Sequence, residues 1–321
     1  MVAGGLVALA WSSDLFVDGA SRAAKSLGIS PLVVGMVVIG FGTSAPELCV
    51  SVISGLSGHA NLSLGNAYGS CAFNIAVILG VSAFICPLVV KPSASLVAGP
   101  GLALTALCSM FLLRDGRCSR LDAGALLVAF CVLMPLYCWY DQRTKGGRND
   151  KCASVPGAGR QGVLASLVEV VAGLAVLVGS SHVLVWGSVD LAKAMGVSDL
   201  VIGLTIVAMG TSLPELASAV AAARRGEHEF VIGNIIGSNL FNMLAVVGLA
   251  CFISPTDGFS PCVMRRDLPF NALLSISILL FGMNLRQRGK PGIVRRREAV
   301  AWIVSFACYT AVMFLQESGR M

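Results

Sequence analysis

Long apolar runs separated by short polar segments fill most of this 321-residue chain. A helix needs roughly 20 mostly apolar residues to cross a bilayer. The runs predict ten spanning helices, at residues 2–20, 31–56, 62–87, 94–113, 121–140, 163–188, 199–223, 230–253, 268–285 and 297–316. The first run has no basic segment ahead of it and reads as a helix rather than a cleavable signal peptide. We therefore expect an all-α membrane protein.

One longer polar stretch separates the fifth run from the sixth. It extends from Asp141 to Arg160 and is rich in glycine and charge, which suits a flexible connector. Its length of about 20 residues is too short for a folded domain. The predicted division is an N-terminal five-helix unit at 1–140, a linker at 141–162 and a C-terminal five-helix unit at 163–321.

Part of the apolar pattern occurs twice. With a constant shift of 168, residues 31–87 align without a gap on residues 199–255, and 21 of the 57 positions are identical. Because five spans is an odd number, the second copy must enter the membrane from the opposite side. The chain is thus predicted to consist of two inverted five-helix repeats, an architecture common in secondary transporters.

Composition agrees with a membrane location, since 56% of the residues are hydrophobic and 12% are charged. Soluble domains carry about 25% charged residues. The net charge of +6 does not indicate a nucleic-acid partner, because the basic residues lie in short loops between apolar runs. With the N-terminus outside, 16 of the 23 Lys and Arg fall on the inner side. This distribution predicts both termini outside and the linker in the cytoplasm, with the cell (inner) membrane as the expected location.

The candidate chemistry lies in the second and seventh runs, which contain the sequences GTSAPEL and GTSLPEL. Each places a glutamate, Glu47 or Glu215, directly after a proline. A charge within a span costs about 2.5–3.5 kcal/mol on insertion scales and calls for a functional reason. The proline should break the helix and free carbonyls in the preceding turn. Such carbonyls are tolerated at membrane depth where they face protein, water or an ion.

The third and eighth runs carry a matching polar stripe, with residues spaced i, i+4 and i+8 on one helix face. The stripes are Asn66, Ser70 and Asn74 in the first copy and Asn234, Ser238 and Asn242 in the second. If these four spans converge, two carboxylates and many neutral oxygens meet near the membrane midplane. Hard oxygen ligands suit Ca²⁺ and Na⁺, and two carboxylates balance one divalent cation. Polar residues of this kind also serve as contacts between helices.

At these residues the chain resembles the cation/Ca²⁺ exchanger superfamily, particularly its prokaryotic sodium/calcium exchanger branch. The similarity rests on GTSAPEL and GTSLPEL, followed by LGNAYGSCAFN and IGNIIGSNLFN. The resemblance implies Ca²⁺ ligation by Glu47 and Glu215, with backbone oxygens of Thr43 and Thr211. It implies Na⁺ ligation or further polar contacts at Ser44, Ser70, Ser212, Ser238, Asn74 and Asn242, with carbonyls of Gly40 and Ala208. It also implies that spans one and six slide to alternate access.

Two positions depart from the family pattern. Cys71 stands where many members have the asparagine of a Gly-Ser-Asn sequence. Asn242 stands where several members have an aspartate, which in potassium-dependent relatives is linked to K⁺ use. We therefore expect no K⁺ dependence. The counter-ion stays open between Na⁺ and H⁺, because the proton-coupled branch also centres on two glutamates.

The sequence therefore predicts a secondary antiporter that exchanges Ca²⁺ for Na⁺, with an H⁺/Ca²⁺ antiporter as the alternative. A channel is less consistent with a site completed within one chain, which also suggests a monomer in the lipid bilayer. The chain contains no HExxH, GxSxG or P-loop sequence, so neither an enzyme nor a nucleotide-driven pump is expected. No tightly bound cofactor is expected, and Ca²⁺ and Na⁺ are the transported ions.

Overall fold

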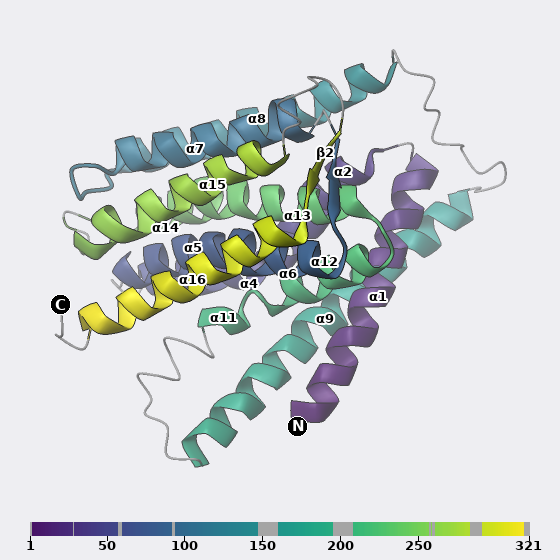
Figure 1. The fold of residues 1–321 in the computed structure, drawn as a ribbon, viewed down its shortest axis with the longest axis horizontal. Helices are drawn as coiled ribbons and strands as arrows, with labels where there is room; N and C mark the ends of the chain where they lie inside the picture. The colour runs from purple at the N-terminus through teal and green to yellow at the C-terminus, as the bar shows by residue number, and fades with distance from the viewer. Residues whose placement is uncertain are drawn as a thin grey trace.

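The structure is a computed structural model that describes residues 2–27, 29–56, 60–91, 94–146, 160–194, 208–256, 258, 261–282 and 291–317. Most of its helices lie side by side in a bundle (Figure 1). Helices α1 (Val2–Leu27) and α9 (Arg160–Ala194) pack against each other, cross the bundle obliquely and extend beyond it.

The first half of the described chain is helical apart from one short strand. After α1 it contains α2 (Pro31–Val34), the π-helical turn η1 (Gly35–Ile39), α3 (Gly40–Thr43), α4 (Ala45–Leu56), α5 (Ala60–Phe73), the π-helical turn η2 (Asn74–Leu79), α6 (Gly80–Ile85), strand β1 (Leu88–Val90), the π-helical turn η3 (Ala94–Ala98), α7 (Gly99–Leu112) and α8 (Arg120–Gly146).

The second half repeats much of this order. After α9 it contains α11 (Ala208–Gly210), α12 (Leu213–Arg224), α13 (His228–Leu240), the π-helical turn η5 (Phe241–Val246), α14 (Val247–Ile253), the π-helical turn η6 (Val263–Asp267), α15 (Leu268–Gly282), strand β2 (Gly292–Val294) and α16 (Arg296–Glu317).

Several of these helices are suited to a bilayer. Within the described ranges, five are long and apolar enough to cross a membrane, and the bent segment from α2 to α4 makes a sixth. The five are Ser63–Ile85, Arg120–Tyr140, Leu164–Val183, His228–Ile253 and Arg296–Gln316. Of the residues in the His228–Ile253 window 89% are buried, against 11% in the Arg296–Gln316 window. The eighth predicted span thus lies at the centre of the bundle, and the tenth presents most of its surface outward.

Both glutamate-bearing segments are broken where the prolines predict. Ser44 separates α3 from α4, and the two parts of this segment are bent by 42°. Ser212 precedes α12 with nearly the same backbone, at φ −93° and ψ 11° against φ −83° and ψ 6° for Ser44. Pro46 and Pro214 are the second residues of the new helices. The N–H groups at this position make no intrahelical hydrogen bond, so proline, which has no N–H, costs nothing there. The prediction of a broken helix in each copy is confirmed.

Close backbone contact seats α13 against the turn η1. A Cβ atom added to Gly237 would lie 2.3 Å from the carbonyl oxygen of Met36, and one on Gly233 would lie 2.4 Å from that of Leu32. Only glycine leaves room for this approach of the two backbones. The result is that a helix of the second copy lies directly beside the broken segment of the first.

The first helix is longer than its apolar run indicates. We expected it to end near residue 20, and this expectation is wrong because α1 continues to Leu27. Asp14 and Asp18 lie within the helix and pair with Arg225. Ion pairs satisfy these charges, which explains how the helix continues through polar residues.

The predicted linker at 141–162 is shortened from both ends. Helix α8 continues through Gly146 and α9 begins at Arg160, while residues 147–159 lie outside the described part of the chain. The predicted run at 199–223 also falls partly outside it, since the structure describes this run only from Ala208 onward. The division into two five-helix units stays a prediction.

Candidate functional site

The two glutamates predicted to bind cations are fully buried at the centre of the bundle. Glu47 and Glu215 are each 0% exposed, and each lies in the first turn of its helix, α4 or α12. The N-terminal end of a helix carries partial positive charge and unpaired N–H groups. Both helix breaks therefore place a carboxylate where its negative charge is best tolerated within an apolar protein.

The serine of each copy contacts the glutamate of the other copy. Ser44 donates a hydrogen bond to Oε1 of Glu215 over 2.9 Å, and Ser212 donates to Oε1 of Glu47 over 2.8 Å. The shift of 168 takes Ser44 to Ser212 and Glu47 to Glu215. The two contacts are thus equivalent under the repeat, and the two broken segments meet at one site.

Each carboxylate has one oxygen held by a serine and a second oxygen without a hydrogen-bond partner among the described residues. The unpaired oxygens are Oε2 of Glu47 and Oε2 of Glu215. Oδ1 of Asn74 and both side-chain polar atoms of Asn242 are likewise buried and unpaired within the described structure. Most buried polar atoms in proteins have a partner, so a group of unpaired oxygens calls for an explanation. A bound cation would supply one.

The first members of the two polar stripes hold the helices in place. Asn66 donates from Nδ2 to the backbone oxygen of Glu47 at 3.2 Å. Its counterpart Asn234 donates to the backbone oxygen of Glu215 at 3.4 Å. Neither was in our predicted ligand set, although both belong to the stripes. Their role here is to fix the glutamate-bearing helices against α5 and α13.

The second members of the stripes contact the opposite copy. The hydroxyl oxygens of Ser70 and Ser212 lie 3.2 Å apart, and Ser238 donates to the carbonyl oxygen of Gly40 over 3.2 Å. We expected proline to leave carbonyls of this turn free, and for Gly40 this is wrong. Its oxygen also accepts from the backbone N–H of Ser44. Any ion that binds this oxygen must compete with a serine hydroxyl.

The last members of the stripes differ between the copies. Asn74 donates from Nδ2 to Oδ1 of Asn239 over 3.0 Å. The repeat counterpart of Asn239 is Cys71, whose thiol lies 3.8 Å from the backbone oxygen of Asn239 and offers no amide group. Asn242, the counterpart of Asn74, therefore lacks the amide partner that Asn74 has. Sequence reasoning missed Asn239, although the Gly-Ser-Asn pattern singled out its position.

The remaining predicted residues lie at or next to the helix breaks. Thr43 is fully buried and donates from its hydroxyl to the backbone oxygen of Ile39 over 2.8 Å. Thr211 lies between α11 and α12 and is partly buried. Ala208 begins α11, and its side chain lies outside the described part of the structure.

The potential ligands at the site are hard oxygen atoms of carboxylate, hydroxyl and amide groups. Within the described ranges no three residues of the types His, Cys, Asp and Glu are grouped as a metal site. Two π-helical turns, η2 and η5, occur at Asn74 and Asn242 in equivalent places of the two copies. Such turns frequently occur at functional sites. The donor set of two carboxylates with hydroxyl and amide oxygens suits Na⁺ or Ca²⁺.

Comparison with known families and proteins identifies extensive similarity. A family model described as "Sodium/calcium exchanger protein" matches residues 1–139 and 165–315. The putative antiporter CaxA of Alkalimonas amylolytica is 35% identical over 313 residues, which cover 97% of this chain and 96% of that protein. The sodium/calcium exchanger MaX1 of Methanosarcina acetivorans is 28% identical, with 97% of this chain and 96% of that protein covered.

The fold is similar to a solved membrane exchanger. The sodium-calcium exchanger NCX_Mj, in a structure soaked with zero Na⁺ and Ca²⁺, superposes with a TM-score of 0.83 at 28% sequence identity. The superposition covers 97% of both chains. The structural similarity thus extends over nearly the whole chain. The residues matched by the family model include both glutamate-bearing segments.

Proposed function

Because the chain belongs to the sodium/calcium exchanger protein family, a family of membrane antiporters, we propose that it exchanges Ca²⁺ for Na⁺ by alternating access. The proposed site is formed by Glu47 and Glu215, which would share one Ca²⁺. The single observation that carries this proposal is the pair of crossed contacts from Ser44 to Glu215 and from Ser212 to Glu47. They bring two buried carboxylates, each with an unpaired oxygen, to one place.

Charge explains how exchange would follow from such a site. Two carboxylates in an apolar interior are costly unless opposite charge accompanies them. One Ca²⁺ neutralises both, and several Na⁺ ions can do the same. An empty, doubly charged site would oppose the conformational change. The protein would therefore change conformation only with Ca²⁺ or with Na⁺ bound. In this proposal no cofactor is needed, and Ca²⁺ and Na⁺ are the substrates.

The remaining ligands would be neutral oxygens around the glutamates. We assign to the Ca²⁺ site the backbone oxygens of Thr43 and Thr211, alongside the two carboxylates. The Na⁺ sites and their polar surroundings would draw on Ser44, Ser70, Ser212, Ser238, Asn74 and Asn242, with carbonyls of Gly40 and Ala208. The Gly40 carbonyl would become available only when Ser238 turns away from it.

We further propose ten spans in two inverted repeats, and the loop pairing supports this arrangement. Strand β1 follows the third span of the first copy and pairs antiparallel with β2, where Leu88 faces Val294. The shift of 168 takes Leu88 to Thr256, which pairs antiparallel with Cys118 ahead of α8. Each copy thus pairs its segment after span three with the other copy's segment before span five. The two pairings lie at opposite ends of the bundle (Figure 1), as inversion requires.

The basic residues favour an orientation in the cell (inner) membrane with both termini outside. The chain would work as a monomer, since both halves of the site come from one chain. Spans one and six, the helices α1 and α9, would slide along the bundle to open the site to either side.

The test is uptake of ⁴⁵Ca²⁺ into vesicles that contain the purified full chain, with Na⁺, K⁺ and H⁺ gradients imposed separately. An outward Na⁺ gradient should drive Ca²⁺ accumulation, and collapsing that gradient should stop it. A K⁺ gradient should have no effect. Uptake that follows only the pH gradient would replace Na⁺ by H⁺ as the counter-ion. Single-channel currents would instead show a passive pore.

A further inference from the structure

Helices α1 and α9 are joined to each other by close contacts. A Cβ atom added to Gly173 of α9 would lie 2.8 Å from the backbone nitrogen of Phe16 in α1. One added to Gly19 of α1 would lie 2.9 Å from the backbone nitrogen of Val170 in α9. Arg22 of α1 also forms an ion pair with Glu169 of α9. These contacts on both helices favour movement of α1 and α9 as one unit.

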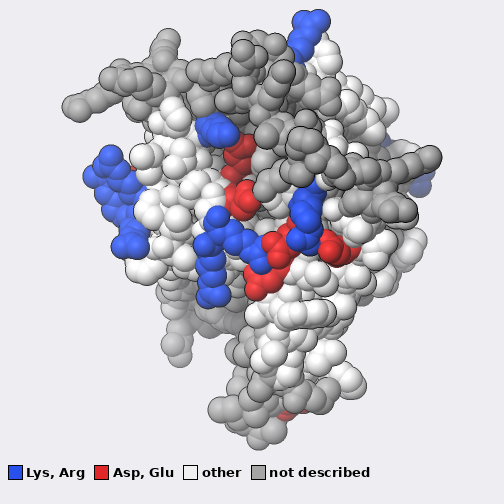
Figure 2. Space-filling model, turned by 90° about the vertical axis from the view of Figure 1, so that its right-hand side faces the viewer, with Lys and Arg blue, Asp and Glu red and all other residues white. Residues whose placement is uncertain are grey.

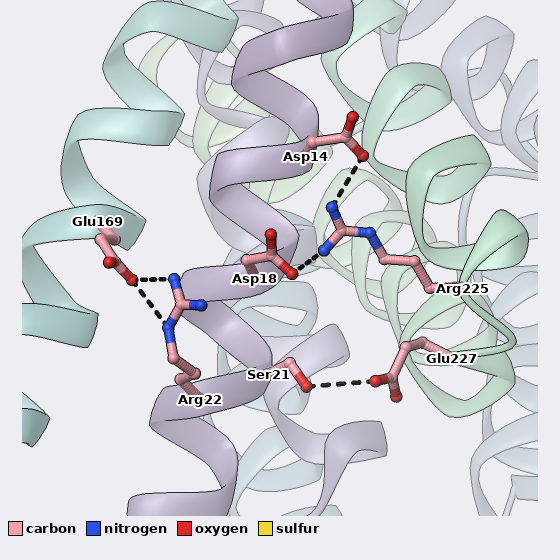
Figure 3. A network of polar contacts seen from close by, with 7 residues as sticks. All are labelled: Asp14, Asp18, Ser21, Arg22, Glu169, Arg225 and Glu227. Carbon is pink, nitrogen blue, oxygen red and sulfur yellow. Dashed lines mark hydrogen bonds and ion pairs between the residues drawn. The ribbon is translucent and has the colours of Figure 1, made fainter.

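A second set of polar contacts joins α1 to the turn between α12 and α13. Arg225 forms ion pairs with both Asp14 and Asp18, the former at 3.0 Å. Ser21 donates a hydrogen bond to Oε1 of Glu227 over 3.2 Å. Figure 3 shows Arg225 reaching toward both aspartates, while Arg22 points away from this turn toward α9. In Figure 2 acidic and basic side chains lie next to one another on this face of the molecule.

Helix α12 connects this turn to the candidate site. Glu215 lies in its first turn, and Arg225 is the residue that follows its last turn. Arg225 follows Glu215 by ten positions, which corresponds to about 15 Å along the helix. Because Arg225 is attached to the helix that carries Glu215, its ion pairs set the position of α1 relative to the site.

The spacing of the two aspartates is suited to movement. Asp14 and Asp18 are four residues apart, so they lie on one face of α1, about one turn or 5.4 Å from each other. Both side chains and that of Arg225 are partly exposed, at 58%, 46% and 30%. Partly exposed ion pairs are weak. Each pair is therefore weak enough to be released while the other is kept.

We propose that Asp14 and Asp18 form a two-position track for Arg225, so that this arginine stays paired while α1 shifts by one turn. Arg225 is then a positioning residue for transport, an inference that rests on the proposed function. When α1 moves toward its C-terminal end, Arg225 keeps Asp14. When α1 moves toward its N-terminal end, Arg225 keeps Asp18. One-turn shifts of this kind are known in switching proteins.

The proposal predicts that the two aspartate variants shift α1 in opposite directions. Asp14→Asn removes the pair that survives movement toward the C-terminal end, so α1 should shift toward its N-terminal end. Asp18→Asn should shift α1 the other way. Asparagine keeps the shape of the side chain and removes only the charge. Arg224→Ala is the matched control, because Arg224 is an adjacent exposed arginine with no ion pair to the described residues.

The experiment is hydrogen–deuterium exchange with mass spectrometry on the full chain in lipid nanodiscs, with Tm measured for each variant. For Asp14→Asn we expect exchange about threefold faster in residues 2–13 and slower in residues 19–27, the size expected for losing one partly exposed ion pair. Asp18→Asn should give the reverse pattern, and Arg224→Ala should match the wild type. Changes in the same direction for both aspartates, or no change, would overturn the proposal.

Transport by the same variants separates this proposal from the proposed function. Both aspartate variants should exchange Ca²⁺ more slowly, while their preference for Ca²⁺ over Mg²⁺ stays that of the wild type because no ligand is altered. Wild-type rates in both variants would overturn the positioning role. If the wild-type chain fails to exchange Ca²⁺ for Na⁺, the proposed function and the positioning role fall together. The hydrogen–deuterium exchange pattern of α1 would then still decide whether the two aspartates act as a track.

Discussion

Ser44 donates its hydroxyl hydrogen to Oε1 of Glu215 over 2.9 Å, although 171 positions separate the two residues in the chain. The reciprocal bond from Ser212 to Glu47 spans 2.8 Å. Each half of the chain therefore completes the carboxylate environment of the other half. Neither copy of the repeat contains the arrangement by itself.

The crossed hydrogen bonds yield the first prediction. Ser44→Ala and Ser212→Ala each remove a hydroxyl that donates to a buried carboxylate. A hydrogen bond to a charged group contributes about 1.5–3 kcal/mol, so the half-saturating Ca²⁺ concentration should rise by roughly tenfold or more. The measurement is ⁴⁵Ca²⁺ uptake into Na⁺-loaded vesicles over a range of Ca²⁺ concentrations.

The matched control for these variants is Ser305→Ala. Among the described residues, the hydroxyl of Ser305 bonds only to the backbone oxygen of Trp302 in its own helix, α16. This variant should keep the wild-type half-saturation. Wild-type values in both site variants would show that the crossed bonds do not contribute to the binding of Ca²⁺.

The contact between α13 and η1 yields the second prediction. Gly237→Ala would place a Cβ atom 2.3 Å from the carbonyl oxygen of Met36, and this oxygen belongs to the backbone. Overpacking of this kind costs about 1–3 kcal/mol or more, so the Tm should fall by several degrees. Gly124→Ala is the control, since no described atom beyond the neighbouring backbone of its own helix lies within 4 Å of a Cβ atom at Gly124. Equal Tm values for the two variants would contradict the close contact.

The third prediction concerns the unequal asparagines. Cys71→Asn would give Asn242 the amide partner that Asn239 provides to Asn74. Leaving a buried polar group unpaired costs about 1–3 kcal/mol, so this variant should raise the Tm by roughly 2–6 °C. Cys71→Ala offers no such partner and should show no gain. An unchanged or lower Tm for Cys71→Asn would mean that Asn242 is already satisfied by another group.

The broken helices could be predicted from the sequence because a local cause produces them. Pro46 and Pro214 disrupt the preceding turn in any helical context. The glutamates were identified for a similar reason, since a charge inside an apolar run is costly wherever the run packs. In both cases one copy of the motif is enough for the inference.

The partners within the site could not be predicted, because they depend on how the two copies face each other. The repeat shows that Ser44 and Ser212 are equivalent, but it does not show that each reaches the other copy's glutamate. The role of Asn239 was missed for the same reason. Its contact with Asn74 exists only once η2 and α13 lie side by side.

The length of α1 was underestimated for a related reason. Hydropathy ends the helix where Asp14, Asp18 and Arg22 begin to dilute the apolar run. In the structure these charges are paired with Arg225 and Glu169, which lie far away in the sequence. A hydropathy pattern contains no information on such partners, so it places the helix end too early.

The proposed sharing of one Ca²⁺ by two buried glutamates is tested most directly by ⁴⁵Ca²⁺ uptake into Na⁺-loaded vesicles that contain Glu47→Gln or Glu215→Gln protein. Glu298→Gln serves as the control, because Glu298 pairs with Arg297 at the start of α16, outside the site. Glutamine keeps the size of the side chain and removes the charge that balances a divalent cation. We predict that each site variant reduces uptake to the level of protein-free vesicles while the control retains wild-type uptake. A Glu215→Gln or Glu47→Gln protein that takes up Ca²⁺ at the wild-type rate would contradict the two-glutamate site.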